Sequence, residues 1–191
     1  KSEAELRALK GQIHPHFLFN TINNLYALAR MKSEKTAPVA LQLANLLRYV
    51  LYESAKPEVP LAQEVKNLQD YVALEKLRFD KDRLDVKMET SIDDPARTIT
   101  PLLLLPLVEN AFKHGVSEKR DEAWVHISIS LKNNVLEATI DNSRETEHTA
   151  NSLGIGLQNV RRQLELLYPN RHELRLSKDD NTFGVYLKIM L

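Results

Sequence analysis

The chain has 191 residues, and its 26 Lys and Arg balance its 26 Asp and Glu, so the formal net charge at pH 7 is zero. This balance argues against nucleic acid or an anionic membrane as the main partner. The absence of cysteine excludes disulfides and thiol chemistry. The longest apolar run, residues 99–108, contains two prolines and is too short to span a bilayer. The first residue is Lys1 rather than Met, and we interpret the chain as a piece excised from a longer protein.

The first part of the chain has apolar residues at the spacing of amphipathic helices. This pattern predicts three helices, over residues 3–31, 37–54 and 61–79. The first two are joined by a short polar break, which predicts that they pack as an antiparallel hairpin. A hairpin leaves one apolar face uncovered, and the pairing of two copies into a four-helix bundle would cover it.

The character of the chain changes at the charged stretch of residues 80–83, which we interpret as a domain boundary. We therefore expect a helical domain over residues 1–82 and a second domain over residues 83–191. Alternating and helical patterns predict strands at 84–92, 125–131, 135–142, 172–177 and 184–190, and helices at 101–114 and 154–168. Pro101 suits a first helical turn and Gly115 a C-terminal cap. Strands in one layer and helices in another give an α/β sandwich, so the predicted fold class is α+β.

The segment from Pro15 to Asn20 places polar groups on a very apolar helix. Pro15 suits a first turn because it lacks an N–H and its φ is fixed. His16 and Asn20 are four residues apart and share one helix face. A lone histidine in such a place is more often a hydrogen-bonded residue at the edge of a core, but its polar neighbours favour a function. A metal site at His14 and His16 lacks any supporting cysteine or well-spaced carboxylate.

A second polar group ends the helix predicted at residues 101–114. Glu109 and Lys113 are four residues apart, as are Asn110 and His114. An amide oxygen is a hard ligand that suits Mg²⁺, and a lysine can meet a phosphate. The alternative is a solvated last turn whose cations interact favourably with the helix dipole.

Two features at residues 141–156 fit a nucleotide. Gly154 and Gly156 lie at the start of the helix predicted at residues 154–168, where backbone N–H groups and the helix N-terminus favour a phosphate, although a single G-x-G is a weak signal. The strand before them ends in Asp141 and Asn142, where a polar side chain could accept a hydrogen bond from an adenine amino group. Strand alternation directs Asn142 toward the helices and Asp141 away from them, unless the strand bulges. The alternative is that these residues start a turn.

With these residues in hand, the chain resembles sensor histidine kinases of the LytS type. The sequence PHFLFN at residues 15–20 is similar to the phosphoacceptor box of that family. LVENAFKHG at residues 107–115 is similar to the N box of the GHKL ATP-binding fold, and LGIGLQNV at residues 153–160 to its glycine-rich box. The motifs keep the family order over essentially the whole chain. The resemblance implies a dimeric helical domain followed by a GHKL-type α/β sandwich that binds ATP and Mg²⁺.

The resemblance also implies a role for each matching residue. His16, directly before Phe-Leu-Phe-Asn, matches the histidine that accepts the phosphoryl group, which favours it over His14, and Asn20 matches its partner one turn on. Glu109 matches a candidate base, next to Asn110 as the Mg²⁺ ligand. The residues implied to bind the nucleotide are Asn110, Lys113, His114, Asp141, Asn142, Gly154, Gly156 and Leu157.

One position departs from the family pattern. The usual Asp-x-Gly-x-Gly after the central strand is replaced by Asn142, Ser143 and Arg144. Asn142 fits the adenine-reading position by register, but an amide accepts a weaker hydrogen bond than a carboxylate. The two glycines of the last box match the hinge of a lid, and we expect the lid, residues 143–153, to be the least ordered segment without ligand.

The function implied is that of a two-component sensor histidine kinase. It would phosphorylate itself on a histidine with ATP and pass the phosphoryl group to an aspartate of a response regulator, itself a DNA-binding regulator. The chain would form a homodimer, would not bind nucleic acid directly, and would be the cytoplasmic portion of a bacterial inner-membrane protein with its membrane or sensory region upstream. The alternative, kept open by Asn142, is a dimeric signalling module that is weak or inactive as a catalyst and acts through protein contacts.

Overall fold

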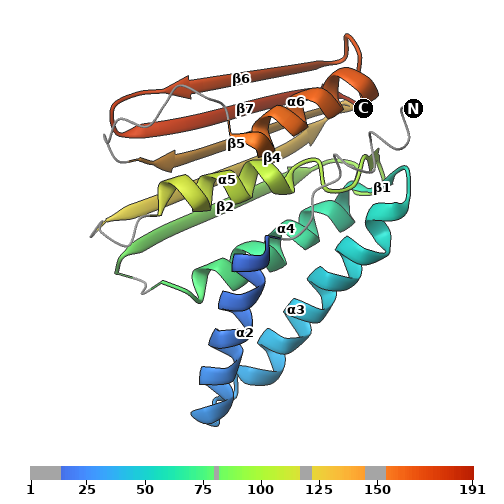
Figure 1. Ribbon diagram of the computed structural model, residues 1–191. Helices are drawn as coiled ribbons and strands as arrows, with labels where there is room; N and C mark the ends of the chain where they lie inside the picture. The colour runs from blue at the N-terminus through green and yellow to red at the C-terminus, as the bar shows by residue number, and fades with distance from the viewer. Residues whose placement is uncertain (1–13, 80–81, 117–121, 145–153) are drawn as a thin grey trace.

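The protein is described by a computed structural model over residues 14–79, 82–116, 122–144 and 154–191 (Figure 1). Its helices are α2 (Pro15–Arg30), α3 (Thr36–Leu51), α4 (Leu61–Lys76), α5 (Leu105–Gly115) and α6 (Ile155–Leu167), with a short 3-10 helix η1 (Glu53–Ala55). Its strands are β1 (Val59–Pro60), β2 (Leu84–Ile92), β3 (Thr98–Ile99), β4 (Ala123–Lys132), β5 (Val135–Ser143), β6 (His172–Lys178) and β7 (Thr182–Met190). Each predicted helix and strand has a counterpart, and the predicted helical residues 3–13 lie outside the described residues. None of the described helices has the length and apolarity needed to cross a bilayer.

Five strands form one mixed sheet in the order β2-β4-β5-β7-β6. β2 and β4 are parallel, and the other neighbours are antiparallel. Along β4, Val125, Ile127 and Ile129 are buried while the residues between them are not, because successive side chains of a strand face opposite sides. Asn133 and Asn134, with φ of 51° and 64°, make the tight turn from β4 to β5, a conformation that asparagine tolerates.

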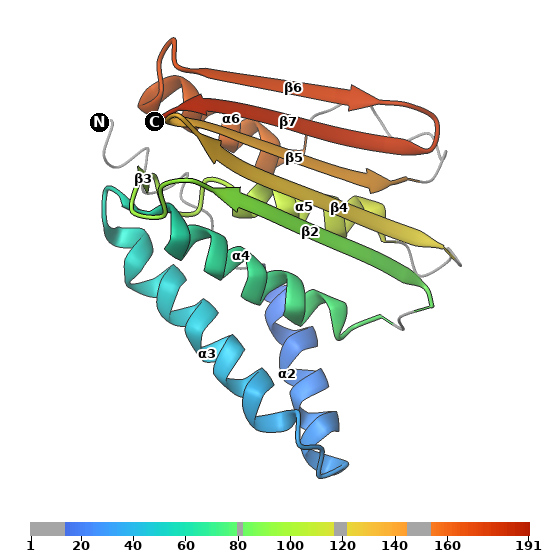
Figure 2. The same ribbon diagram turned by 180° about the vertical axis from the view of Figure 1, so that it is seen from behind.

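The elements are arranged in layers (Figures 1 and 2). α5 and α6 cover one face of the sheet, α4 runs beside the edge strand β2, and α2 and α3 project away from the sheet. A two-residue ladder, in which Val59 pairs with Ile99 and Pro60 with Thr98, ties the start of α4 to the segment before α5. The predicted α+β class is therefore confirmed, and α4 is the element that joins the helical hairpin to the α/β layers.

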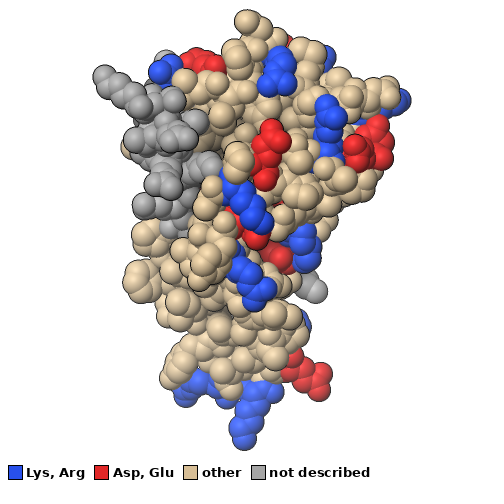
Figure 3. Space-filling view, turned by 90° about the vertical axis from the view of Figure 1, so that its right-hand side faces the viewer, with Lys and Arg blue, Asp and Glu red and all other residues tan. Residues whose placement is uncertain are grey.

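The helical hairpin packs through its inner side and leaves apolar groups on its outer side. Phe17 and Thr21 of α2 are buried. On the outer side of α2, Phe19, Ile22 and Tyr26 are 68%, 46% and 65% exposed, and their spacing puts them on one stripe. Figure 3 shows much uncharged surface over the projecting helices, above a tip where Lys and Arg gather. The hairpin thus has the uncovered apolar face that the sequence predicts.

Two details of the sequence prediction are wrong, and both concern α5. The helix predicted from Pro101 begins at Leu105, because Leu102 has a φ of 59°, a left-handed conformation that a right-handed helix does not include. Gly115, predicted as the C-terminal cap, is instead the last residue of α5, and no described glycine has a positive φ. Its small size matters instead, since a Cβ there would lie 2.7 Å from the Cβ of Asn142.

Candidate functional site

His16 lies exposed on the first turn of α2, one residue after the proline that starts the helix. Its ring nitrogens Nδ1 and Nε2 are 3.2 and 3.4 Å from Nδ2 of Asn20, as the four-residue spacing predicts. His14 lies before the helix in extended backbone, with φ of −63° and ψ of 123°, and its side chain makes no capping hydrogen bond. His16 and Asn20 are thus brought together, and His14 is separate from them.

The turn that carries His16 is fixed to α4 by aromatic packing. The rings of Phe17 and Tyr71 have centroids 4.7 Å apart, and the ring of Tyr71 also meets that of Phe112 on α5, at 6.0 Å. The Thr21 hydroxyl donates a hydrogen bond of 2.8 Å to the carbonyl oxygen of Phe17, on the same buried side. Tyr71 therefore contacts both the histidine-bearing helix and α5.

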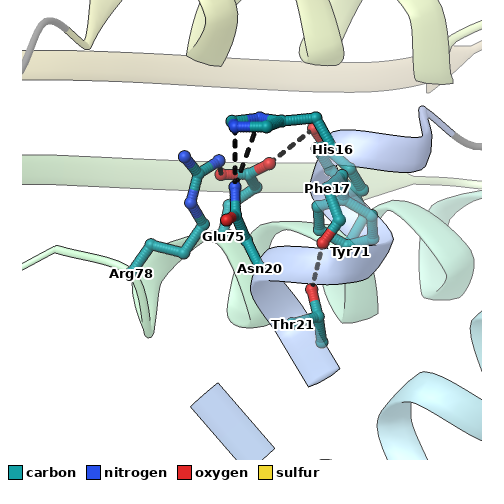
Figure 4. Close-up of polar contacts among 7 residues, drawn as sticks. All are labelled: His16, Phe17, Asn20, Thr21, Tyr71, Glu75 and Arg78. Atoms are coloured by element: carbon teal, nitrogen blue, oxygen red, sulfur yellow. Dashed lines mark hydrogen bonds and ion pairs between the residues drawn. The ribbon is translucent and has the colours of Figure 1, made fainter. Parts of the chain in front are cut away.

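A buried carboxylate that the sequence analysis missed lies next to His16 (Figure 4). Glu75 of α4 accepts hydrogen bonds from the Tyr71 hydroxyl at 3.0 Å and from Arg78 at 3.2 Å. Burial raises the pKa of Glu75, whereas Arg78, Tyr71 and the nearby His16 act to lower it. The spacings of four and three residues from Glu75 to these two partners on α4 are the signal that could have identified the cluster.

Of the predicted polar residues on α5, Glu109 and Asn110 are half-buried, whereas Lys113 and His114 are exposed. Burial, followed by repulsion from Glu75, raises the pKa of Glu109 to about 7, and its Oε1 atom is buried without a hydrogen-bond partner among the described residues. A carboxyl group with such a pKa can exchange a proton near neutral pH. Lys113 and His114 reach the surface one turn later, and partial burial and the charge of Lys113 lower the pKa of His114.

Asn142 and Asp141 lie on opposite faces of the sheet. Asn142 is fully buried against Gly115 of α5. Its Nδ2 donates to the Ser143 carbonyl oxygen at 2.8 Å, while its Oδ1 has no partner among the described residues. Asp141 faces away from the helices, where burial raises its pKa and His126 acts to lower it. Only Asn142 is therefore directed at the helices.

The glycine-rich segment meets α5 at the start of α6. Gly154 precedes the helix in extended backbone, and a Cβ on it would lie 3.9 Å from Oδ1 of Asn110. Gly156 is inside the helix with open space around it, and Leu157 is buried. Most of the predicted lid, residues 145–153, lies outside the described residues.

These residues fit a nucleotide with its metal ion. The buried Oδ1 of Asn142 is an acceptor that needs a donor, and an adenine amino group is one. The half-buried Asn110 offers an amide oxygen next to the first turn of α6, where free backbone N–H groups favour phosphate oxygens. Gly154 lies next to Asn110 of α5, and Asn142 of β5 lies next to Gly115, the last residue of the same helix.

Comparisons with known proteins point to one group. A family model described as histidine kinase matches residues 4–84. The chain is 32% identical to the sensor protein LytS of Streptococcus mutans and 30% identical to the sensor histidine kinase YpdA of Escherichia coli, each over 200 residues, 97% of the chain and 34% of the relative. The chain thus spans about a third of the length of these relatives.

The fold of almost the whole described chain also has a solved counterpart. The histidine kinase domain of a blue-light activated histidine kinase from Erythrobacter litoralis EL346 matches with a TM-score of 0.55 and 16% identity. The match covers 93% of the chain and 96% of that domain. It therefore includes both the helical hairpin and the α/β layers in their chain order.

Proposed function

We propose that the chain, whose similarity groups it with the LytS-type sensor histidine kinases, carries the ATP-dependent kinase module of such a protein. In this proposal, His16 takes the γ-phosphoryl group of ATP and passes it to an aspartate of a response regulator. Residues 1–82 serve as the dimerisation and phosphoacceptor domain, and residues 83–191 bind the nucleotide. We further propose that the chain is the cytoplasmic portion of a bacterial inner-membrane sensor, whose response regulator is a DNA-binding protein.

The observation that carries the proposal is the common contact of α2 and α5 with one stretch of α4. Tyr71 packs against Phe17, next to His16, and against Phe112 on α5. Glu75, one turn later, interacts electrostatically with both His16 and Glu109. Side chains of α4 thus connect the helix of the proposed acceptor histidine with the helix that bears the proposed Mg²⁺ ligand.

The proposed chemistry assigns each group one task. An unprotonated ring nitrogen of His16 donates its lone pair to the γ-phosphorus, and the bond from that phosphorus to the bridging oxygen breaks, so that ADP leaves with the electron pair. Asn110 would hold Mg²⁺, Lys113 and His114 would meet phosphate oxygens, and Asn142 would accept from adenine. Mg²⁺, when bound, neutralises charge on the phosphates, and such transfers depend mainly on positioning and charge neutralisation. Incubation with γ-labelled ATP and Mg²⁺ tests the proposal, because phosphohistidine is an acid-labile and base-stable product.

The second candidate is a dimeric module with weak or no kinase activity that signals by contact. The observation that favours it is Asn142, an amide whose own N–H₂ group already donates to the Ser143 carbonyl oxygen. A neutral acceptor binds an amino group less strongly than a carboxylate does. Absence of both nucleotide binding and labelling would favour this candidate.

Mg²⁺-ATP should stabilise the protein. At a nucleotide concentration about 100 times Kd, binding adds about 2.7 kcal/mol to the free energy of unfolding, a rise in Tm of roughly 5–10 °C for a chain of this size. Asn110→Ala should lose most of the Mg²⁺-dependent part of this rise while melting like the unmodified protein without nucleotide. Differential scanning fluorimetry with ATP, with and without EDTA, measures both effects. No rise for the unmodified protein at millimolar nucleotide would contradict the prediction.

The outer stripe of α2 should make the chain dimerise. Phe19, Ile22 and Tyr26 present an apolar surface that a second hairpin would bury. Sedimentation equilibrium should give a dimer for the unmodified chain and a shift toward the 21.9 kDa monomer for Tyr26→Glu. Met190→Glu is the matched control, since Met190 is an exposed apolar residue of β7, far from the hairpin. A monomer at all concentrations, or equal dimerisation of both variants, would argue against this interface.

A further inference from the structure

Glu75 is a buried charged group next to the proposed acceptor histidine, and no role has yet been given to it. Its side chain is only 4% exposed, on the last full turn of α4. The carboxylate receives one hydrogen bond on each oxygen, from Tyr71 on Oε1 and from Arg78 on Oε2. Each carboxylate oxygen can accept about two hydrogen bonds, so the group retains the capacity to accept another.

The His16 imidazole occupies the side of Glu75 that faces α2. Figure 4 shows the ring over the carboxylate, with the Asn20 amide beside it, and a positive charge on the ring would lower the pKa of Glu75. Phe17, the residue after His16, is locked against Tyr71, the residue one turn before Glu75. The packing of α2 on α4 therefore sets the distance between the imidazole and the carboxylate.

We propose that Glu75 is a positioning residue for His16: its carboxylate accepts a hydrogen bond from one imidazole N–H, so that the other ring nitrogen is the unprotonated nucleophile. Asn20 then holds the ring from α2, and Glu75 holds it from α4. The kinetic consequence rests on the proposed kinase function, whereas the contact between Glu75 and His16 does not. This arrangement follows the general rule that the hydrogen bond made by one ring nitrogen determines the state of the other.

The charge of Glu75 suits the reaction as well as the resting state. When the ring nitrogen bonds to phosphorus, the imidazole gains positive charge while the proton on its other nitrogen remains in place. A carboxylate that is already fixed beside that proton stabilises the positive charge without reorganising. Arg78 and Tyr71 hold the carboxylate in this position, and Arg78 favours its ionised form.

The decisive variant is Glu75→Gln, and the same helix supplies its control. Asp70 is a carboxylate of α4 with a side chain only 5% exposed, and it pairs with Lys66 at 2.7 Å. It lies five residues before Glu75, a spacing that puts the two side chains on different sides of the helix. Asp70→Asn therefore removes a comparable buried charge and ion pair without touching the histidine. Glu75→Asp keeps the charge but withdraws it by one methylene, and it serves as the second variant if Glu75→Gln does not fold.

The first measurement is the tautomer ratio of His16, read from ¹⁵N shifts of the imidazole in histidine-labelled protein and assigned with His16→Gln. One tautomer should dominate in the unmodified chain and in Asp70→Asn. In Glu75→Gln the ratio should move toward that of free imidazole, with an intermediate change in Glu75→Asp. An unchanged ratio in both Glu75 variants would overturn the proposal.

The second measurement is the rate of autophosphorylation at varied ATP concentration. Glu75→Gln should lower kcat roughly 100-fold, as a small misplacement of a reacting group does, and leave KM for ATP unchanged, because Glu75 does not touch the nucleotide. Asp70→Asn should retain both values. A kcat for Glu75→Gln equal to that of Asp70→Asn would refute the positioning role. Absence of labelling in the unmodified chain would count against the kinase proposal alone, and the tautomer ratio would still decide whether Glu75 holds His16.

Discussion

His16→Gln should abolish acid-labile phosphorylation of the protein, whereas His14→Gln should retain it. Glutamine has no nucleophilic ring nitrogen, so loss of the acceptor removes the reaction entirely rather than slowing it. The two histidines differ in how they are held. His16 is in the regular helix next to Asn20, and a nucleophile needs a fixed angle of approach. His14 lies in extended backbone before Pro15, without a capping contact of its side chain.

The measurement is the transfer of label from γ-labelled ATP, with a melting curve for each variant as the control. Both histidines are exposed, so each substitution should change the free energy of unfolding by no more than about 0.5 kcal/mol. Retention of label in His16→Gln with loss in His14→Gln would reverse the assignment. Undiminished labelling of both variants would mean that neither histidine is required as the acceptor.

Local spacing in the sequence was enough to predict the features that depend on one helix or one strand. The pairing of His16 with Asn20 follows from a four-residue interval on a helix. The burial of Asn142 follows from strand alternation, which puts it on the same face as Ile140. The uncovered apolar face of the hairpin was predicted as well, but the residues of α2 that form it, Phe19, Ile22 and Tyr26, are known only from the structure. The first two features need no knowledge of which elements meet.

Contacts between distant elements were what the sequence could not provide. Glu75 has an ordinary helical environment in the sequence, and it gains its meaning only when α2 packs across α4 and brings His16 to it. Gly115 was interpreted as a cap, because the close approach of β5 that excludes a Cβ there depends on the sheet. The start of α5 was misplaced for the same reason, since the backbone of Leu102 is held by a residue on another helix.

The residue that holds the backbone of Leu102 is Glu64, and Glu64→Ala should strongly destabilise the protein. Glu64 is fully buried on α4. It accepts hydrogen bonds from the backbone N–H groups of Leu102 and Leu104, at 3.1 and 3.4 Å, and from the Tyr49 hydroxyl of α3. Alanine would leave three buried donors without an acceptor, which costs about 3 kcal/mol or more. Thermal unfolding should show a fall in Tm of roughly 6–12 °C for a chain of this size.

Two variants test whether the loss of stability is specific to Glu64 or would follow from removing any glutamate. Glu64→Gln keeps one acceptor oxygen in place and should lose less stability than Glu64→Ala. Glu165→Ala removes a half-exposed carboxylate that pairs with Arg162 on the surface of α6, and it should change the free energy of unfolding by no more than about 0.5 kcal/mol. Equal melting of all three variants would contradict the prediction.

Glu64→Ala should also weaken nucleotide binding, because Glu64 holds the segment from which α5 begins. Leu102 adopts a left-handed backbone that costs roughly 1–2 kcal/mol in a non-glycine residue, and the hydrogen bond from its N–H to Glu64 offsets that cost. Without it, the start of α5 can shift, and Asn110 moves with the helix. The Mg²⁺-ATP stabilisation of Glu64→Ala should therefore be smaller than that of Glu64→Gln. An equal or larger stabilisation of Glu64→Ala would mean that the start of α5 is fixed by the packing of Leu102, Leu103 and Leu104, each at most 1% exposed. In that case α4 and α5 would be joined by hydrophobic contact alone.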